Sequence, residues 1–292
     1  MSVPKISYDL ITEDKYSLTF SKKIVYSNVC LLKEEKMKQK KEQIALFFIG
    51  TITLISFIVI WFIAPIPQDA NYHNFADSRN ILQVSNFWNV ISNVPYFLVG
   101  IYAFYKLLSL KSLTIINETK QAYVIFFGGV TLVAFGSGYY HLNPSNETLL
   151  WDRLPMTIAF MALFSFVISE FFSLKLGKYL LLPLLFLGMT SVFYWFFSEL
   201  DNAGDLRAYA LVQFLPMLIM PMMFLFFKAS FSLVLGYWYL LLCYLLAKVF
   251  EHFDSQIYEL LGFISGHSLK HIISALGVYI LVRTFEKRTI NS

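Results

Sequence analysis

Long apolar runs, separated by short polar connections, form the dominant pattern of the chain after residue 42. Each run has roughly 20 residues, which is the length that an α-helix needs to cross the hydrocarbon core of a bilayer. We therefore predict an all-α, polytopic membrane protein with a seven-helix core bundle and one extra N-terminal transmembrane helix. The eight expected spans are residues 44–65, 88–108, 122–142, 153–174, 178–198, 206–227, 229–250 and 266–284.

The composition agrees with this pattern. Of the 292 residues, 57% are hydrophobic, 18% aromatic and only 14% charged, and the mean hydropathy is +0.60. A soluble domain does not have this composition, and nothing in the sequence suggests nucleic-acid binding. Cys30 and Cys243 are poorly placed to pair with each other and form no CxxC motif, so we expect no structural disulfide.

The polar segment at the N-terminus suggests how the chain is divided. Residues 1–42 are polar, end in the basic run KEEKMKQKKEQ, and lack the short basic region followed at once by an apolar one that marks a signal peptide. We expect a cytoplasmic N-terminal segment at 1–42 and an uncleaved membrane helix with its outer loop at 43–87. The seven-helix core would then occupy 88–285, and a cytoplasmic tail 286–292.

Basic residues in the connections predict the orientation, because cytoplasmic loops carry an excess of Lys and Arg. If the N-terminal lysines are cytoplasmic, eight crossings place both termini and most other basic residues on that side. These residues are Lys106, Lys111, Lys120, Lys175, Lys178, Lys228, Arg283, Lys287 and Arg288. The same count places His141, Asp152, His267 and His271 at similar depth, toward the non-cytoplasmic side.

The second expected span carries a polar face. Asn89, Ser92, Asn93 and Tyr96 recur at intervals of three and four residues and therefore share one side of the helix. Polar side chains within a span tend to face the bundle interior. They would either point toward a functional site or form hydrogen bonds that hold the helices together.

Three of the five histidines form the clearest candidate for chemistry. His267 and His271 lie four residues apart in GHSLKH, so both imidazoles project from one helix face and can bind one ion. His141, at matching depth, would complete a set of three. Three histidines with an open fourth position is the arrangement of catalytic zinc, which lowers the pKa of a water molecule to about 7. We treat His73 and His252, in polar outer loops, as non-ligands.

Three acidic residues and one serine near these histidines each allow two interpretations. Asp152 is either a helix N-cap or a general acid–base that serves the water and the leaving amine. Ser137, one turn before His141, either packs between helices or stabilises an oxyanion. Glu251 and Asp254 either pair with Lys248 or hold a histidine N–H.

These residues together resemble the alkaline ceramidase family, within the CREST superfamily of seven-helix membrane hydrolases. The likeness rests on GSGYYH, on WD and on GHSLKH, with weaker similarity in FWNVISN and DLRAYALVQFLP, and covers roughly residues 70–285. It implies zinc bound by His141, His267 and His271, with Asp152 as acid or base and Ser137 as transition-state stabiliser.

The reaction that the resemblance implies is hydrolysis of the amide bond of a ceramide-like membrane lipid to a sphingoid base and a fatty acid. Eukaryotic members also hold calcium, using a glutamate where this chain has Asn86. The spacing of Asp77 and Asn80 does not follow that pattern, so we do not predict calcium. The alternatives are a receptor-like seven-helix protein, a lipid esterase of the same superfamily, or a haem protein that uses paired histidines.

Overall fold

The computed structural model describes the backbone of residues 11–291 and the side chains of residues 36, 37 and 39–291. It divides into two compact units, with the boundary after Gly50. Helix α1 (Ile11–Phe62) crosses that boundary. Of the polar segment predicted at 1–42, residues 1–10 lie outside the described residues, and residues 11–42 are helical.

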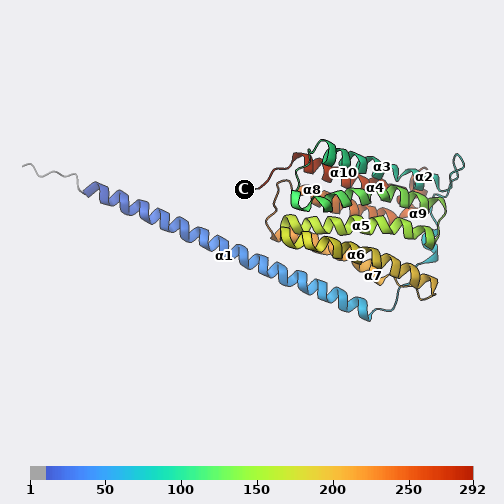
Figure 1. Ribbon diagram of the computed structural model, residues 1–292, viewed down its shortest axis with the longest axis horizontal. Coiled ribbons are helices and arrows are strands. Elements are labelled where there is room, and N and C mark those ends of the chain that lie inside the picture. Colours follow the sequence, from blue (N-terminus) through green and yellow to red (C-terminus); the bar gives the residue numbers. More distant parts are fainter. Residues whose placement is uncertain (1–10, 292) are drawn as a thin grey trace, which may run out of the picture. The chain divides into compact units, whose positions relative to one another are not determined.

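The second unit is an antiparallel helical bundle (Figure 1). Its long helices pack in chain order, α4 against α5, α5 against α6 and α6 against α7, while α10 packs against α8 and α3. Short connections between successive helices favour antiparallel neighbours. The helices are α2 (Phe87–Ile91), α3 (Val94–Phe104), α4 (Lys120–Leu142), α5 (Asn146–Phe171), α6 (Leu174–Leu200), α7 (Arg207–Phe226), α8 (Leu235–His252), α9 (Asp254–Leu261) and α10 (Gly266–Lys287).

Seven helical segments of the described chain are long and apolar enough to cross a membrane, so the protein is an integral, multi-pass membrane protein. The prediction had eight. The span expected at 229–250 corresponds to α8, which begins only at Leu235 and is not among the seven. Several aromatic residues, together with Lys248 and Glu251, lower the hydropathy of this short helix.

Close packing between α4 and α5 determines where the polar residues meet. Gly136 of α4 lies directly against the Trp151 carbonyl of α5, and a Cβ atom at this position would overlap that oxygen. Only glycine permits such an approach of two backbones. The contact brings the C-terminal turns of α4 next to the first turns of α5, and so brings Ser137 and Asp152 to the same region.

The two ends of the bundle differ in chemistry. The end where α4 finishes and α10 begins holds the candidate histidines, and we call it the histidine end. At the opposite end, called the tail end, Arg288 forms a buried ion pair of 2.7 Å with Glu170. Tyr123 and Tyr237 donate hydrogen bonds to the same carboxylate at 2.6 and 2.7 Å. This buried cluster joins α4, α5, α8 and the segment after α10.

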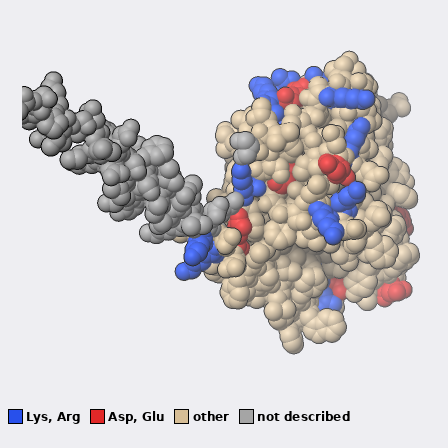
Figure 2. Space-filling model, turned by 60° about the vertical axis from the view of Figure 1, so that its left-hand side comes forward, with Lys and Arg blue, Asp and Glu red and all other residues tan. Residues whose placement is uncertain are grey.

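The topology brings to the tail end the basic residues that were predicted to be cytoplasmic. Figure 2 turns this end toward the viewer, and Lys and Arg side chains gather there on a surface that is otherwise mostly uncharged. Lys106 and Arg283 both pair with Glu286, at 2.7 and 2.8 Å. The basic residues are therefore grouped as the sequence pattern predicts.

Candidate metal centre

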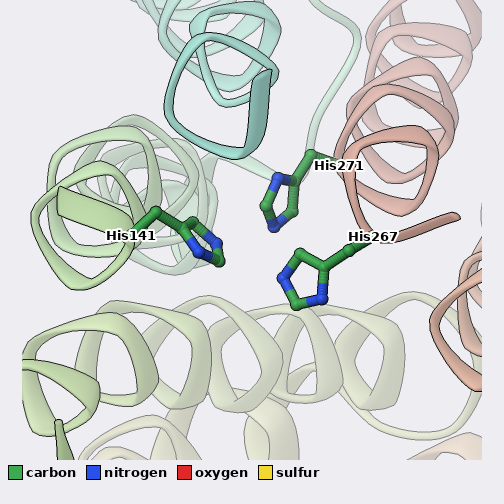
Figure 3. Close-up of side chains that lie close together, drawn as sticks. All are labelled: His141, His267 and His271. Atoms are coloured by element: carbon green, nitrogen blue, oxygen red, sulfur yellow. The ribbon is translucent and has the colours of Figure 1, made fainter. Parts of the chain in front are cut away.

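Three buried histidines meet at the histidine end (Figure 3). His141 comes from the last turn of α4, and His267 and His271 come from the first two turns of α10. One ring nitrogen from each lies within 4.8 Å of those of the other two. Their exposed fractions are 0%, 5% and 4%. The structure therefore brings together the three histidines that the sequence singles out.

The start of α10 is held in place by two side-chain caps. The Ser265 hydroxyl accepts a hydrogen bond from the Ser268 N–H at 3.2 Å, and the Asp254 carboxylate accepts one from the His267 N–H at 2.7 Å. Such caps satisfy backbone donors that the first turn of a helix leaves free. Of the two interpretations of Asp254, the structure therefore shows a bond to a histidine N–H, that of the His267 backbone, while Lys248 pairs with Glu251.

The ring nitrogens fit a metal ion. Both nitrogens of His141 and Nε2 of His267 are buried and have no hydrogen-bond partner among the described residues. A buried polar atom without a partner costs about 1–3 kcal/mol, so an ion that accepts one lone pair from each ring would stabilise the cluster. Imidazole nitrogen is a preferred donor for zinc, and the donor set can hold that ion.

The tautomer of His271 follows from its neighbour Ser92. The Ser92 hydroxyl donates its only hydrogen to the Asn89 carbonyl at 3.0 Å. Its oxygen therefore accepts from Nδ1–H of His271 at 2.8 Å. This arrangement leaves the lone pair on Nε2, the nitrogen available to a metal. A partner of this kind typically orients a metal-binding histidine.

The polar face of the second expected span reaches the histidines through Ser92. Besides Ser92, the Asn89 side chain accepts a hydrogen bond from the Ser268 hydroxyl at 2.7 Å, and Asn86 donates to the His141 carbonyl at 2.8 Å. These bonds also hold α2 against α4 and α10. The face therefore serves both purposes that the sequence left open.

The loop before α2 covers the histidines. The Phe75 ring packs at 4.7 Å from the ring of His141 and 4.8 Å from that of His267, measured between centroids. His73, in the same loop, bonds Tyr140 and Asn146 and lies outside the cluster. Sequence reasoning missed Phe75, because one phenylalanine among 30 carries no distinguishing signal.

Asp152 lies within α5 and is not its N-cap. Ser145 caps this helix, in a reciprocal arrangement with Thr148, and α5 begins at Asn146. The N-cap interpretation of Asp152 and the expected start of the span at residue 153 are therefore wrong, because Asn146–Leu150 extend the helix by more than one turn. The buried Asp152 carboxylate interacts with the Ser137 hydroxyl.

A cavity of about 320 Å³ connects this polar region to the apolar interior of the bundle. Its polar end contains Ser137, Asp152 and His271. The remaining lining is mainly apolar and comes from α4, α5, α7, α8 and α10: Phe126, Val130, Val133, Met156, Leu163, Phe214, Met217, Leu241 and Val278. The polar groups therefore meet one end of a long apolar space.

A partly buried charged network borders the polar end of the cavity. Glu251 pairs with Lys248 at 2.8 Å and with Lys270 of α10, so it forms the ion pair that was one of its two interpretations. The Tyr72 hydroxyl donates to the same carboxylate at 3.3 Å. Burial, and then the nearby Glu251, raise the pKa of Tyr72 well above its ordinary value. Sequence reasoning missed Lys270 and Tyr72.

Comparison with known families identifies one match. The sequence model of the family described as Ceramidase matches residues 73–291. This range contains Ser137, Asp152 and all three clustered histidines, and it begins in the loop that covers them. A search among curated proteins found no match.

Proposed function

The chain belongs to the ceramidase family, and on this basis we propose that it is a zinc-dependent membrane hydrolase that cleaves the N-acyl amide bond of ceramide-like lipids. The observation that carries the zinc part of this proposal is the cluster of buried, unpartnered nitrogens of His141 and His267 beside His271. The amide-hydrolase part is supported by the family match.

The three histidines would hold the zinc ion, with His271 oriented by Ser92. Zinc in a three-histidine site supplies Lewis acidity, which makes water nucleophilic at neutral pH and polarises a carbonyl group. The buried surroundings, including the Phe75 ring, limit access of bulk water to the reacting groups.

Asp152 would act as the general base and then as the general acid. It takes a proton from the attacking water, whose oxygen forms a bond to the acyl carbon, and it delivers a proton to the nitrogen as the C–N bond breaks. The products are a fatty acid and the amine of a sphingoid base. The Ser137 hydroxyl would donate a hydrogen bond to the oxyanion that develops on the acyl oxygen.

The cavity supports a lipid substrate. Along α5 it extends from Asp152 to Leu163, which is about 16 Å of helix at 1.5 Å per residue. Its apolar lining would bury a long acyl chain, while the amide lies at the polar end. We further propose that α8 is an eighth crossing, that both termini are cytoplasmic and that the histidine end faces the non-cytoplasmic side, because the basic residues gather at the tail end.

Hydrolysis by the purified full-length protein tests the proposal. We expect fatty acid and sphingoid base from ceramides in a panel that also contains phospholipids and glycosylphosphatidylinositol-like lipids. Cleavage of esters alone would support the esterase alternative, and no cleavage of any lipid would support the receptor-like one.

Metal analysis with a pair of histidine variants tests the zinc site. His267→Ala should lose bound zinc and lower activity more than about 100-fold, because it removes a direct ligand. His252→Ala, which changes an exposed histidine in α8, should keep both. Activity in the His267 variant, or a haem absorption band in the wild type, would contradict the zinc mechanism.

A further inference from the structure

Arg153, the residue after Asp152, is a buried cation held among aromatic rings. Its guanidinium carbon lies 4.0 Å from the ring centroid of Trp195, 4.7 Å from that of Tyr209 and 5.7 Å from that of Tyr72. The residue is 5% exposed. The rings attract the cation through their π faces, and the Tyr209 side chain also interacts with the guanidinium.

The hydrogen bonds of Arg153 are incomplete. Nη2 donates to the side-chain oxygen of Gln68 at 2.6 Å, which is a neutral acceptor. Nη1 is buried and has no partner among the described residues. No carboxylate of the described chain lies within ion-pair distance of this guanidinium. Arginine keeps its charge in proteins, and a buried charge without an opposite charge is strongly destabilising.

The surroundings of Arg153 have an excess of positive charge. The cavity is lined by three cationic side chains, Arg153, Lys248 and Lys270, and by two carboxylates, Asp152 and Glu251. Glu251 is already paired with both lysines. Arg153 itself lines the cavity, so a ligand at the polar end lies beside the residue that carries the unpartnered Nη1 donor.

From these observations we propose that Arg153 forms an oxyanion-binding subsite at the polar end of the cavity, and that it selects lipid amides whose polar group carries a phosphate or a carboxylate. This proposal rests on the proposed function. An oxyanion would supply both the missing charge and an acceptor for Nη1, and charge-assisted hydrogen bonds are about twice as strong as neutral ones. Asp152, one residue earlier, would remain at the amide bond.

Kinetics with two matched substrates test the selectivity. A ceramide and its phosphate monoester, with the same acyl chain and base, are compared in detergent micelles containing the full-length, zinc-loaded protein. We expect the wild type to favour the phosphorylated lipid about 10- to 100-fold in kcat/KM, the range for one hydrogen bond to a charged group. Arg153→Met should reduce this ratio to about one, and Arg283→Met, at the tail end, should keep it.

An equal ratio in Arg153→Met and the wild type overturns the subsite, as does a wild type that cleaves the neutral ceramide and shows no preference for the phosphorylated one. If Arg153→Met does not fold, the ratio of kcat/KM between the two lipids in the wild type decides whether the subsite exists. Inorganic phosphate serves as the competing free anion. If the phosphorylated lipid is hydrolysed at the same rate in millimolar phosphate, the result supports a lipid-borne oxyanion as the ligand of Arg153. Inhibition at that concentration overturns the lipid as the source of the oxyanion.

A binding measurement separates this proposal from the proposed hydrolysis. The phosphorylated lipid should raise the Tm of the wild type by a few degrees more than the neutral lipid does, because a ligand that binds only the folded state stabilises it. This difference does not require turnover. If neither amide is cleaved but the difference in Tm is present and depends on Arg153, the hydrolase proposal fails and the subsite stands. Equal Tm values with both lipids overturn the subsite.

Discussion

Replacing Ser92 by alanine should weaken metal binding while leaving the bundle folded. The change removes the oxygen that accepts the hydrogen bond of 2.8 Å from Nδ1 of His271. The ring then loses one of the contacts that favour the tautomer with its lone pair on Nε2, the Asn89 backbone being the other. The Asn89 carbonyl stays satisfied, because the Asn93 side chain also donates to it, at 2.7 Å. The perturbation is therefore confined to His271.

The expected size of this effect is a 10- to 100-fold loss of zinc affinity, about 1.4–2.8 kcal/mol, the range measured for partners of metal-binding histidines. Zinc retained by the purified protein against a competing chelator measures it. Ser191→Ala is the matched control, since Ser191 on α6 is a buried serine that donates to the Gly188 carbonyl at 2.7 Å. Ser92→Thr should restore affinity. Equal zinc affinity in the two alanine variants would refute the reasoning.

Two further predictions concern stability. Gly136→Ala should lower the free energy of unfolding by about 1–3 kcal/mol, since the added methyl group overlaps a neighbouring backbone. Thermal unfolding measures this loss. The control is Gly138→Ala, because nothing lies within 4 Å of a Cβ atom at that position. An equal loss in both variants would contradict the packing argument. Glu170→Gln should destabilise the protein by about 3–5 kcal/mol because Arg288 loses its buried partner, whereas a change in Tm no larger than that of the exposed-site variant Glu147→Gln would exclude this role.

The helices and the histidine cluster could be predicted because each leaves a periodic signal. An apolar run of sufficient length predicts a span almost regardless of what surrounds it. The four-residue interval between His267 and His271 predicts a shared face. His141 could be added through the count of crossings, which brought it to the same depth. These inferences need only helix geometry and the thickness of a bilayer.

The sequence-based predictions were wrong, or missed a residue, where contacts with distant segments determine the local structure. Asp152 looked like an N-cap because the polar NPSNE segment resembles a loop, yet Ser145 caps the helix seven residues earlier than the apolar run suggested. Arg153 could not be singled out from the sequence, because hydropathy does not reveal that rings from other segments surround it. Phe75 belongs to an irregular loop, and the position of this loop over the histidines leaves no periodic pattern in the sequence.

The distribution of the three histidines has a consequence for the order in which the protein is assembled. Helices α5 to α9 lie in the sequence between His141 and His267, so a bound metal would cross-link two distant points and enclose five helices in one covalent and coordinate loop. Two of the three donors belong to α10, the last helix of the described chain. During synthesis from the N-terminus, the donor set is incomplete until that helix has been made, so a metal ion held by these three histidines would be acquired late in biogenesis.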